Sequence, residues 1–336
     1  MTIPRTEADF RALLESCDGA LAARLADEAV AVRRSVYGDR VFVRGLLEIT
    51  DICRNDCLYC GIRRSNLKCE RYRLNPDVIV ASASHAYGLG FRTVVMQGGE
   101  DPYFTDEVLS GVIRRIKADS PGIAVTLSMG ERTYDSYSRL FDAGADRYLL
   151  RHETADPVHY AKLHPAEMSF QNRMRCLEDL RRIGYQVGCG FMVGSPWQTA
   201  GTIAKDLKFI ADFKPDMCGI GPFVPHRDTP FRDFPRGTVE LTCLLLSIVR
   251  LIHPPVLLPA TTALGTIDQA GREKGILAGA NVVMPNLTPL SERGKYELYD
   301  GKLSTGAESA EVLKDLAARI ESAGCRLDFS RGDAPR

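Results

Sequence analysis

Residues 46–61 read LLEITDICRNDCLYCG, and this stretch joins a strand-like run to a cysteine-rich loop. The run at 46–50 is largely apolar and has the length of a strand buried in a sheet. Similar runs recur along the chain and alternate with segments of helical periodicity, which is typical of βα units around a parallel sheet. We therefore predict strands at 46–50, 93–96, 123–127, 147–150, 186–193, 217–220, 256–258 and 281–284.

The segments between these runs carry apolar residues at helical spacing. Several of them end in a glycine that precedes a short turn, as at Gly88, Gly144, Gly184 and Gly279. Eight strands with intervening helices predict an α/β fold, a (βα)8 barrel of the TIM type. The expected helices are 78–87, 106–118, 134–143, 170–183, 203–213 and 239–252.

The chain divides into three predicted parts. Residues 1–43 read as an N-terminal helical extension, 44–303 as the barrel, and 304–336 as a closing helix at 308–323 followed by a polar tail. No Pro- or Ser-rich linker separates a further domain. Because barrels of this kind carry their chemistry on the loops that follow the strands, polar residues at those points are the candidates for function.

Composition narrows the classes of partner. Lys plus Arg number 43 and Asp plus Glu number 43, so no net field favours nucleic acid. Residues 1–10 lack the apolar core of a signal peptide, and the most apolar later run, 244–249, is too short to span a bilayer. We expect a cytoplasmic protein without nucleic-acid or membrane partners.

The cysteine loop carries the strongest chemical signal. Cys53, Cys57 and Cys60 form a CxxxCxxC loop directly after the first predicted strand. A 4Fe-4S cluster usually takes four thiolates, so three leave one iron free to chelate the amino and carboxylate groups of a small molecule. Structural zinc is the alternative, but it requires four protein ligands, and no further His or Cys follows at short spacing. The scattered cysteines are expected to be small buried hydrophobes: Cys17, Cys69, Cys176, Cys189, Cys218, Cys243 and Cys325.

With this loop in place, the sequence resembles the HydE family of FeFe-hydrogenase maturases. These are radical S-adenosylmethionine (SAM) enzymes related to biotin synthase and methylornithine synthase. The cysteine loop marks the radical SAM superfamily, and the later motifs mark this branch. The matching stretches are 53–64, 97–102, 147–154, 219–226, 259–265 and 280–286.

Two of these motifs also have a physical reading as SAM contacts. Gly98 and Gly99 let the backbone approach a ligand while Glu100 offers acceptors to an ammonium group. Arg151 and Glu153 place a cation beside an acceptor, which suits a carboxylate and a ribose hydroxyl. The alternatives are a glycine-rich turn and a packed core histidine at His152. The resemblance assigns Tyr59, Gln97, Gly98, Gly99, Glu100, Ser128, Arg151, Glu153 and Arg173 to SAM, and Arg147, Thr261, Thr262, Tyr296 and Tyr299 to the substrate.

The resemblance implies a function. A 4Fe-4S cluster on the three cysteines cleaves SAM reductively to a 5′-deoxyadenosyl radical, in assembly of the di-iron site of FeFe-hydrogenase. The implied substrate is a small organometallic iron species, and the implied partners are an electron donor and the other maturases, in transient contact. Some relatives hold a second cluster on C-terminal cysteines, but beyond Cys243 this chain has only Cys325, which predicts a single cluster.

Three other functions are alternatives to a hydrogenase maturase. A methylornithine-synthase-like mutase shares the one-cluster design, and spacing does not separate it. A non-catalytic iron–sulfur carrier has no need of the groups at 98–100 and 151–153. Biotin synthase is disfavoured because the predicted strand at 123–127 and Ser128 after it lack a cysteine, and Thr261 and Thr262 stand where an arginine is needed.

Overall fold

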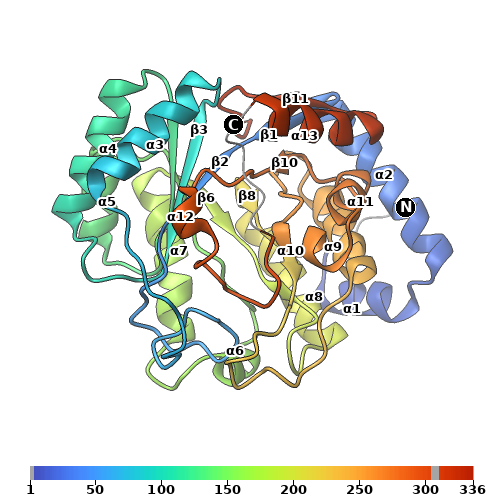
Figure 1. Cartoon of the computed structure of the whole chain (residues 1–336). Coiled ribbons are helices and arrows are strands. Elements are labelled where there is room, and N and C mark those ends of the chain that lie inside the picture. The colour runs from blue at the N-terminus through green and yellow to red at the C-terminus, as the bar shows by residue number, and fades with distance from the viewer. Residues whose placement is uncertain (1–3, 304–309, 336) are drawn as a thin grey trace.

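The computed structural model describes residues 4–303 and 310–335 of the chain. Strands gather at the centre of the molecule and helices lie around them (Figure 1). The principal sheet has six parallel strands, and its order follows the chain, as expected for successive βα units. The strands in spatial order are β2 (Gly45–Thr50), β3 (Thr93–Gly98), β4 (Ala124–Ser128), β5 (Arg147–Leu149), β6 (Gln186–Cys189) and β8 (Met217–Cys218).

Single parallel bridges, rather than continuous ladders, link the two edges of this sheet. The predicted seventh strand at 256–258 forms no ladder of its own, and the eighth is reduced to β10 (Val282–Val283). The predicted α/β architecture with a parallel barrel-type sheet is confirmed, with its last two strands very short. The linking pairs are Met217 with Leu257, Pro259 with Val282, and Asn286 with Leu46.

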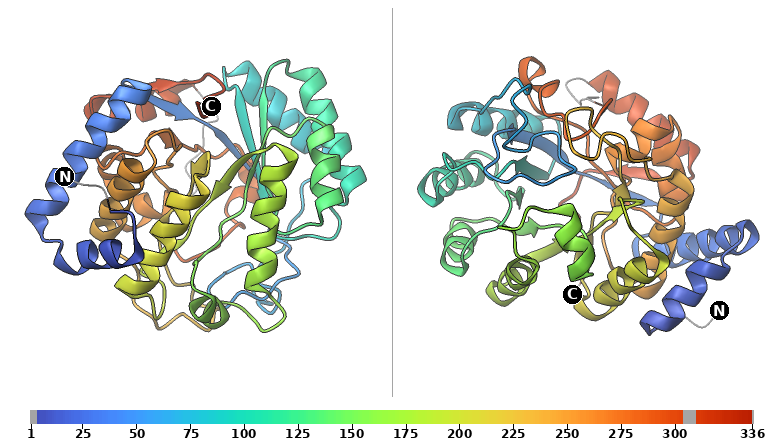
Figure 2. Two further views of the ribbon diagram at one scale, coloured as in Figure 1. Left: turned by 180° about the vertical axis from the view of Figure 1, so that it is seen from behind. Right: turned by 90° about the horizontal axis from the view of Figure 1, so that it is seen from below.

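The helices form the outer layer (Figure 2). Most begin after a Ser, Thr, Asn or Asp whose side chain accepts a hydrogen bond from a backbone N–H of the first turn, as Thr105 does from Val108. The six predicted helices are confirmed within a few residues at each end. They are α3 (Pro76–Gly88), α4 (Asp106–Asp119), α5 (Tyr134–Asp142), α7 (Phe170–Ile183), α8 (Ala200–Phe213) and α9 (Val239–Ile252).

Four short helices lie in loops and were not predicted. Each has seven residues or fewer, so none repeats an apolar pattern often enough to stand out in the sequence. Three of them follow the sixth strand of the principal sheet. They are α6 (Pro157–Leu163), α10 (Thr262–Ile267), α11 (Gly271–Leu277) and α12 (Leu290–Arg293).

The N-terminal part differs from the prediction at one point. Helices α1 (Glu7–Ser16) and α2 (Gly19–Tyr37) pack on α8 and α9, as an extension outside the sheet. Residues 40–43, which we expected to be helical, instead form the strand β1 (Arg40–Val43), which pairs with β10 and β11 (Arg326–Asp328). The short apolar run Val41 to Val43 is fully buried, which favours a strand.

The predicted strand at 186–193 is interrupted at Gly190. This residue has φ +150°, and a Cβ there would lie 2.0 Å from the carbonyl oxygen of Gly219. The chain therefore bends where only glycine fits. Beyond the bend, β7 (Met192–Val193) pairs with β9 (Gly221–Pro222) in a separate two-stranded ladder.

The C-terminal segment covers the N-terminal end of the strands. Helix α13 (Ala310–Ser322) lies within the predicted closing helix 308–323, of which 308 and 309 fall outside the described residues. After β11 the tail reaches the buried start of β5, where Arg147 Nη2 lies 2.6 Å from Asp333 Oδ1. The same guanidinium donates to Thr93 Oγ1 at 3.1 Å and to the carbonyl oxygen of Arg331 at 2.6 Å.

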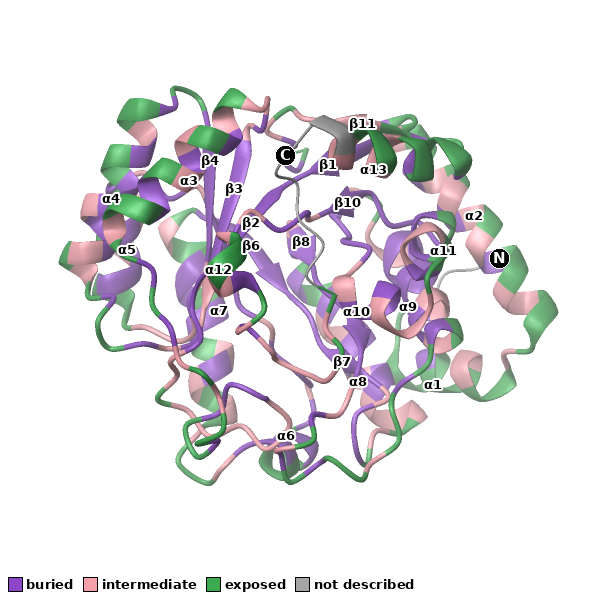
Figure 3. Cartoon of the chain, in the orientation of Figure 1, coloured by how far each residue is buried: buried purple, intermediate pink, exposed green. Residues whose placement is uncertain are grey.

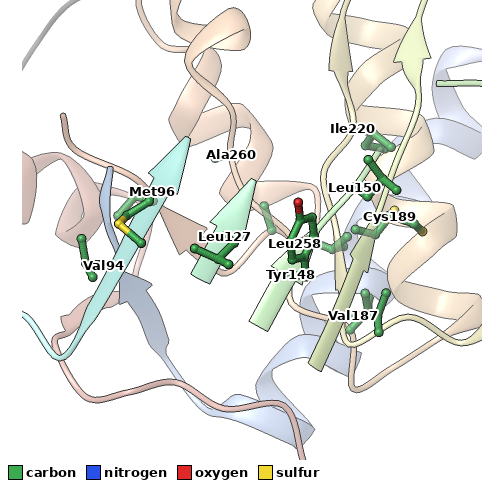
Figure 4. Close-up of a cluster of buried hydrophobic side chains, with 14 of the residues drawn as sticks. Val94, Met96, Leu127, Tyr148, Leu150, Val187, Cys189, Ile220, Leu258 and Ala260 are labelled. Atoms are coloured by element: carbon green, nitrogen blue, oxygen red, sulfur yellow. The ribbon is translucent and has the colours of Figure 1, made fainter. Parts of the chain in front are cut away.

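Burial is concentrated on the strands and on the inner faces of the helices (Figure 3). Apolar side chains from neighbouring strands meet in this core, among them Met96, Leu127, Tyr148 and Val187 (Figure 4). In the described part of the chain, no helix is both long enough and apolar enough to cross a membrane.

Candidate functional site

The loops that follow the strands enclose a cavity of about 340 Å³ at the C-terminal ends of the strands. This is the end of the sheet at which barrel enzymes build their active sites. Most of the predicted site residues lie around this cavity. Those that line it are Cys53, Tyr59, Cys60, Gln97, Gly98, Gly99, Glu100, Ser128, Arg151, Glu153, Arg173, Thr261, Thr262, Tyr296 and Tyr299.

The cysteine loop forms one wall. Cys53 Sγ accepts a hydrogen bond from the backbone N–H of Glu100 at 3.4 Å, and the backbone N–H of Cys60 donates to the carbonyl oxygen of Cys57 at 3.3 Å. Cys57 does not line the cavity, and its Sγ lies 3.6 Å from Met168 Sδ. Tyr59 packs against His164, with its Oη 3.3 Å from His164 Nε2.

Burial raises the pKa of all three thiols, and that of Cys60 to about 12. The charge of Cys53 adds to the effect at Cys60, because the two sulfurs are near each other. Thiolates in this loop therefore need a bound cation to balance them. Among the described residues, no three His, Cys, Asp or Glu side chains converge as ligands of one metal ion.

The loop after β3 lies against the cysteine loop. A Cβ on Gly99 would lie 2.3 Å from the carbonyl oxygen of Ile52 and 2.7 Å from Cys53 Cβ, so only glycine allows this contact. The Glu100 carboxylate accepts from Arg54 Nε and from the backbone N–H of Glu131, both at 2.9 Å. Glu100 thereby ties three loops together at the edge of the cavity.

Arg151 and Glu153 follow β5 and face the cavity. Arg151 Nη2 lies 3.2 Å from Glu153 Oε2, but the two atoms do not form a well-aligned hydrogen bond. Glu153 has φ +66°, a left-handed backbone conformation that is costly for a residue with a side chain. Strained residues of this kind gather at binding sites, where the surrounding structure holds them in place.

Arg173, near the start of α7, reaches the same region. Its Nε donates to Glu131 Oε1 and its Nη1 to the carbonyl oxygen of Arg151, both at 2.5 Å. Glu131 was not predicted as a site residue, because nothing in its local sequence reveals that α7 brings an arginine to it. Ser128, at the end of β4, lines the cavity beside Gln97 on the neighbouring strand.

The opposite wall carries hydroxyl groups. Thr261 and Thr262 stand at the start of α10, and Tyr296 and Tyr299 come from the segment after α12. Tyr296 Oη lies 3.4 Å from Gln97 Nε2. Burial raises the pKa of Tyr299 to about 12, so its hydroxyl stays protonated at neutral pH and is available as a donor.

Two further charged residues on the cavity wall were missed. Lys302 Nζ lies 2.6 Å from Glu48 Oε1, and Asn286 Nδ2 donates to Glu48 Oε2 at 2.8 Å. A signal for Glu48 was present, since a carboxylate in the middle of an otherwise apolar strand is unusual. Lys302 gave none.

Arg147 does not join this cavity. It is the first residue of β5 and therefore lies at the opposite end of the parallel strands, where it binds Asp333. The resemblance that made it a substrate candidate placed it at the wrong end of its strand, and the structure gives it a stabilising contact with the C-terminal tail.

Several buried polar atoms on the cavity walls lack an aligned hydrogen bond. Among the described residues, Arg151 Nε and Thr261 Oγ1 are buried without a hydrogen bond, and Arg151 Nη2 and Glu153 Oε2 form an ion pair at 3.2 Å but no aligned hydrogen bond. Such atoms are rare in native proteins unless a ligand or water satisfies them. Their grouping in one cavity indicates a site built for a polar ligand.

Comparisons with known proteins identify the family of this chain. A family profile described as the radical SAM superfamily matches residues 47–210. The HydE subunit of the FeFe hydrogenase maturase of Thermotoga maritima is 45% identical over 301 residues, covering 90% of this chain and 85% of that protein. The 3-methylornithine synthase of Methanosarcina barkeri is 30% identical over 325 residues, covering 96% and 90%.

A solved structure extends the likeness to the fold. The crystal structure of methylornithine synthase (PylB) superposes with a TM-score of 0.84 at 26% identity and covers 97% of this chain and 95% of that one. With nearly half of the aligned residues identical to a HydE protein over most of both chains, the protein belongs to the HydE family of radical SAM enzymes.

Proposed function

We propose that this protein cleaves SAM reductively and acts in assembly of the di-iron active site of FeFe-hydrogenase. The proposal rests on one observation above the others. The three-cysteine loop opens onto a cavity whose walls hold buried polar atoms without an aligned hydrogen bond, in a chain that is 45% identical to a hydrogenase maturase. The 4Fe-4S cluster, when bound, supplies the electron that breaks a sulfur–carbon bond of SAM to give methionine and a 5′-deoxyadenosyl radical.

In this proposal Cys53, Cys57 and Cys60 hold the cluster. Their side chains fit the group, because they lie in one loop after β2 at the CxxxCxxC spacing, and thiolates are the usual ligands of such a cluster. Gly99 lets the backbone after β3 lie directly against the cysteine loop, which brings the backbone N–H of Glu100 within 3.4 Å of Cys53 Sγ.

The remaining cavity residues divide between two tasks. Tyr59, Gln97, Gly98, Gly99, Glu100, Ser128, Arg151, Glu153 and Arg173 orient SAM. Arg151 and Glu153 support this role, because their facing polar atoms form no aligned hydrogen bond with each other, and a carboxylate and a ribose hydroxyl suit a guanidinium and a carboxylate as partners. Thr261, Thr262, Tyr296 and Tyr299 contact the substrate from the facing wall. Enclosure by these walls limits water and holds the reacting groups close together.

The proposed substrate is a small organometallic iron species. The proposed partners of the protein are an electron donor and the other hydrogenase maturases, in transient contact. The proposed location of the protein is the cytoplasm. The facing wall suits a compact polar substrate, since its hydroxyl groups both donate and accept hydrogen bonds.

A second candidate is a methylornithine-synthase-like mutase. It is favoured by the similarity to methylornithine synthase over almost the whole chain, at 30% identity in sequence and a TM-score of 0.84 in structure. A role as an iron–sulfur carrier without turnover explains neither the cavity nor its unpartnered polar atoms.

An assay of hydrogenase maturation distinguishes the maturase role from the mutase role. The protein is reconstituted anaerobically and added, with SAM and reductant, to apo-hydrogenase and a lysate of cells that make the other maturases. We expect hydrogen evolution that depends on this protein and is lost in Cys53→Ser, while Cys243→Ser, a matched change on the outer helix α9, supports it fully. SAM cleavage without hydrogenase activation, together with 3-methylornithine formed from added amino acids, contradicts the maturase role.

A further inference from the structure

His152 lies between two cavity residues but does not itself face the cavity. It is fully buried, and its ring packs against Phe209, with ring centroids 4.8 Å apart, and against Phe191 at 5.9 Å. The neighbouring side chains of Arg151 and Glu153 do line the cavity. Any effect of His152 on the ligand is therefore transmitted through the backbone and not by contact.

The hydrogen bonds of the ring determine its protonation. The backbone N–H of Gly190 donates to His152 Nδ1 at 3.2 Å, and because a backbone N–H only donates, Nδ1 carries no proton. The proton is on Nε2, which donates to Asp206 Oδ1 at 3.2 Å. Burial lowers the pKa of His152 to about 3, so the ring is neutral at physiological pH.

Gly190 connects this ring to Glu153. Its N–H binds His152, and its carbonyl oxygen accepts from the backbone N–H of Glu153 at 3.0 Å. The carbonyl oxygen of Glu153 in turn accepts from the N–H of Met192 at 3.4 Å. The residues on both sides of the interrupted strand are thus tied to residues 152–153.

Asp206 anchors the ring to a helix. It is fully buried on α8, and its Oδ1 also accepts from the backbone N–H of Ala155 at 2.5 Å. The same carboxylate oxygen therefore fixes the His152 ring and the chain just beyond Glu153. Asp206, which does not line the cavity, therefore holds the chain on both sides of the strained Glu153.

We propose that His152 is a positioning residue for SAM. With Asp206 it holds the Gly190 bend, and the bend keeps Glu153 in its left-handed conformation with the carboxylate directed into the cavity before SAM arrives. Pre-organisation of this kind raises affinity because the ordering cost is met during folding and not on binding. The inference rests on the proposed function, since it takes SAM to be the ligand of Glu153.

Two substitutions separate the two nitrogens of the ring. His152→Asn keeps an acceptor near the position of Nδ1 for Gly190 and loses the donor to Asp206, whereas His152→Gln keeps a donor near Nε2 and loses the acceptor. The Kd of SAM is measured by calorimetry on the cluster-loaded, unreduced protein, so the readout is binding and not turnover. We expect Kd to rise about tenfold in His152→Gln and less in His152→Asn, with His85→Asn on the exposed face of α3 unchanged.

A double-mutant cycle distinguishes positioning from a general loss of stability. If His152 acts through Glu153, then His152→Gln adds no further loss of SAM affinity in a Glu153→Ala background. Additive losses overturn the proposal, and so does an unchanged Kd in His152→Gln alone. Wild-type protein that fails to bind SAM overturns the proposed function and this inference with it, whereas wild-type binding with unaffected variants overturns only the inference.

Hydrogen exchange tests the claim without any substitution, in case the variants do not fold. In the wild-type protein, a peptide that covers residues 189–192 is expected to show the same slow amide exchange with and without SAM, because the bend is formed in advance. Protection of these amides from exchange that develops only when SAM is added contradicts a bend formed before SAM binds.

Discussion

Glu153 concentrates the binding chemistry in one residue. Its carboxylate lines the cavity, one of its oxygens is buried without a hydrogen bond, and its backbone is strained. Three unusual properties at one position are expected where a side chain is held ready for a ligand.

Removing that carboxylate should weaken SAM binding and spare the cluster. We expect Glu153→Ala to lose about 1.5 to 3 kcal/mol of SAM binding free energy, the scale of a hydrogen bond to a charged group. Iron content should stay at the wild-type level, because Glu153 forms no hydrogen bond with the three cysteines. Calorimetry with SAM and an iron assay measure the two quantities. An unchanged SAM affinity would remove Glu153 from the site.

Single residues were predictable where the chemistry is local. Cys53, Cys57 and Cys60 stand out by spacing alone, and the glycines at 98 and 99 by their position after a strand. Glu131 and Lys302 were not predictable, because their roles depend on Arg173 and Glu48, which are distant in sequence. Arg147 was misassigned although the start of its strand was predicted correctly, because the resemblance, and not its position in the strand, made it a substrate candidate.

At the scale of elements, the close approach of two loops builds the site. The loop after β3 touches the cysteine loop through Gly99, and no other residue fits there. This contact fixes the distance between the cluster ligands and the residues proposed to hold SAM.

Gly99→Ala should therefore disturb the cluster. The added methyl group meets backbone atoms of Ile52, so one loop must move, and overpacking of this kind costs about 1 to 3 kcal/mol. We expect lower iron content and weaker SAM binding. Gly111→Ala in α4 is the matched control, because a Cβ there has no neighbour within 4 Å and alanine favours the helix. Equal iron content in both variants contradicts this account of the loop contact.

Helices were predicted better than strands. Each long helix carries an apolar stripe and begins after a capping residue, so its sequence is locally complete. The strand at 186–193 is broken because Gly190 meets Gly219 between β8 and β9, and β1 forms because β10 and β11 lie beside it. Both outcomes depend on partners that a local pattern does not contain.

Across the whole molecule, the C-terminal tail seals the end of the sheet opposite the cavity. Its Asp333 binds the fully buried Arg147. Burial raises the pKa of the Asp333 carboxyl, but the hydrogen bond from Arg331, the charge of Arg147 and the hydrogen bond from Gln186 together lower it below its ordinary value.

Asp333→Asn should destabilise the fold by about 1 to 3 kcal/mol at neutral pH, because it leaves the Arg147 guanidinium buried without its counter-charge. A carboxyl whose pKa is lowered on folding stabilises the protein above its unfolded pKa of 3.8 and loses that effect as the pH falls through the folded pKa. The difference between wild type and variant in the free energy of unfolding by urea should therefore be constant above about pH 5 and narrow progressively as the pH falls below about 4. A difference that does not change with pH contradicts the ion pair as its cause.

The number of clusters is also a property of the whole chain. Cys325 is buried in the core, where its Sγ lies 3.6 Å from the carbonyl oxygen of Ala323. We expect about four irons per chain after anaerobic reconstitution, and the same number in Cys325→Ser. About eight irons in the wild type, with half lost in Cys325→Ser, contradicts the single cluster.

The central claim is that the three-cysteine loop drives cleavage of SAM, and the most direct measurement is the yield of 5′-deoxyadenosine from SAM under reducing, anaerobic conditions. The reconstituted wild-type protein and Cys243→Ser should form 5′-deoxyadenosine together with methionine, and Cys57→Ser should form none, because a hydroxyl is a poor ligand for iron. Formation by Cys57→Ser at the wild-type rate, or none by wild-type protein that carries its full complement of iron, contradicts the account.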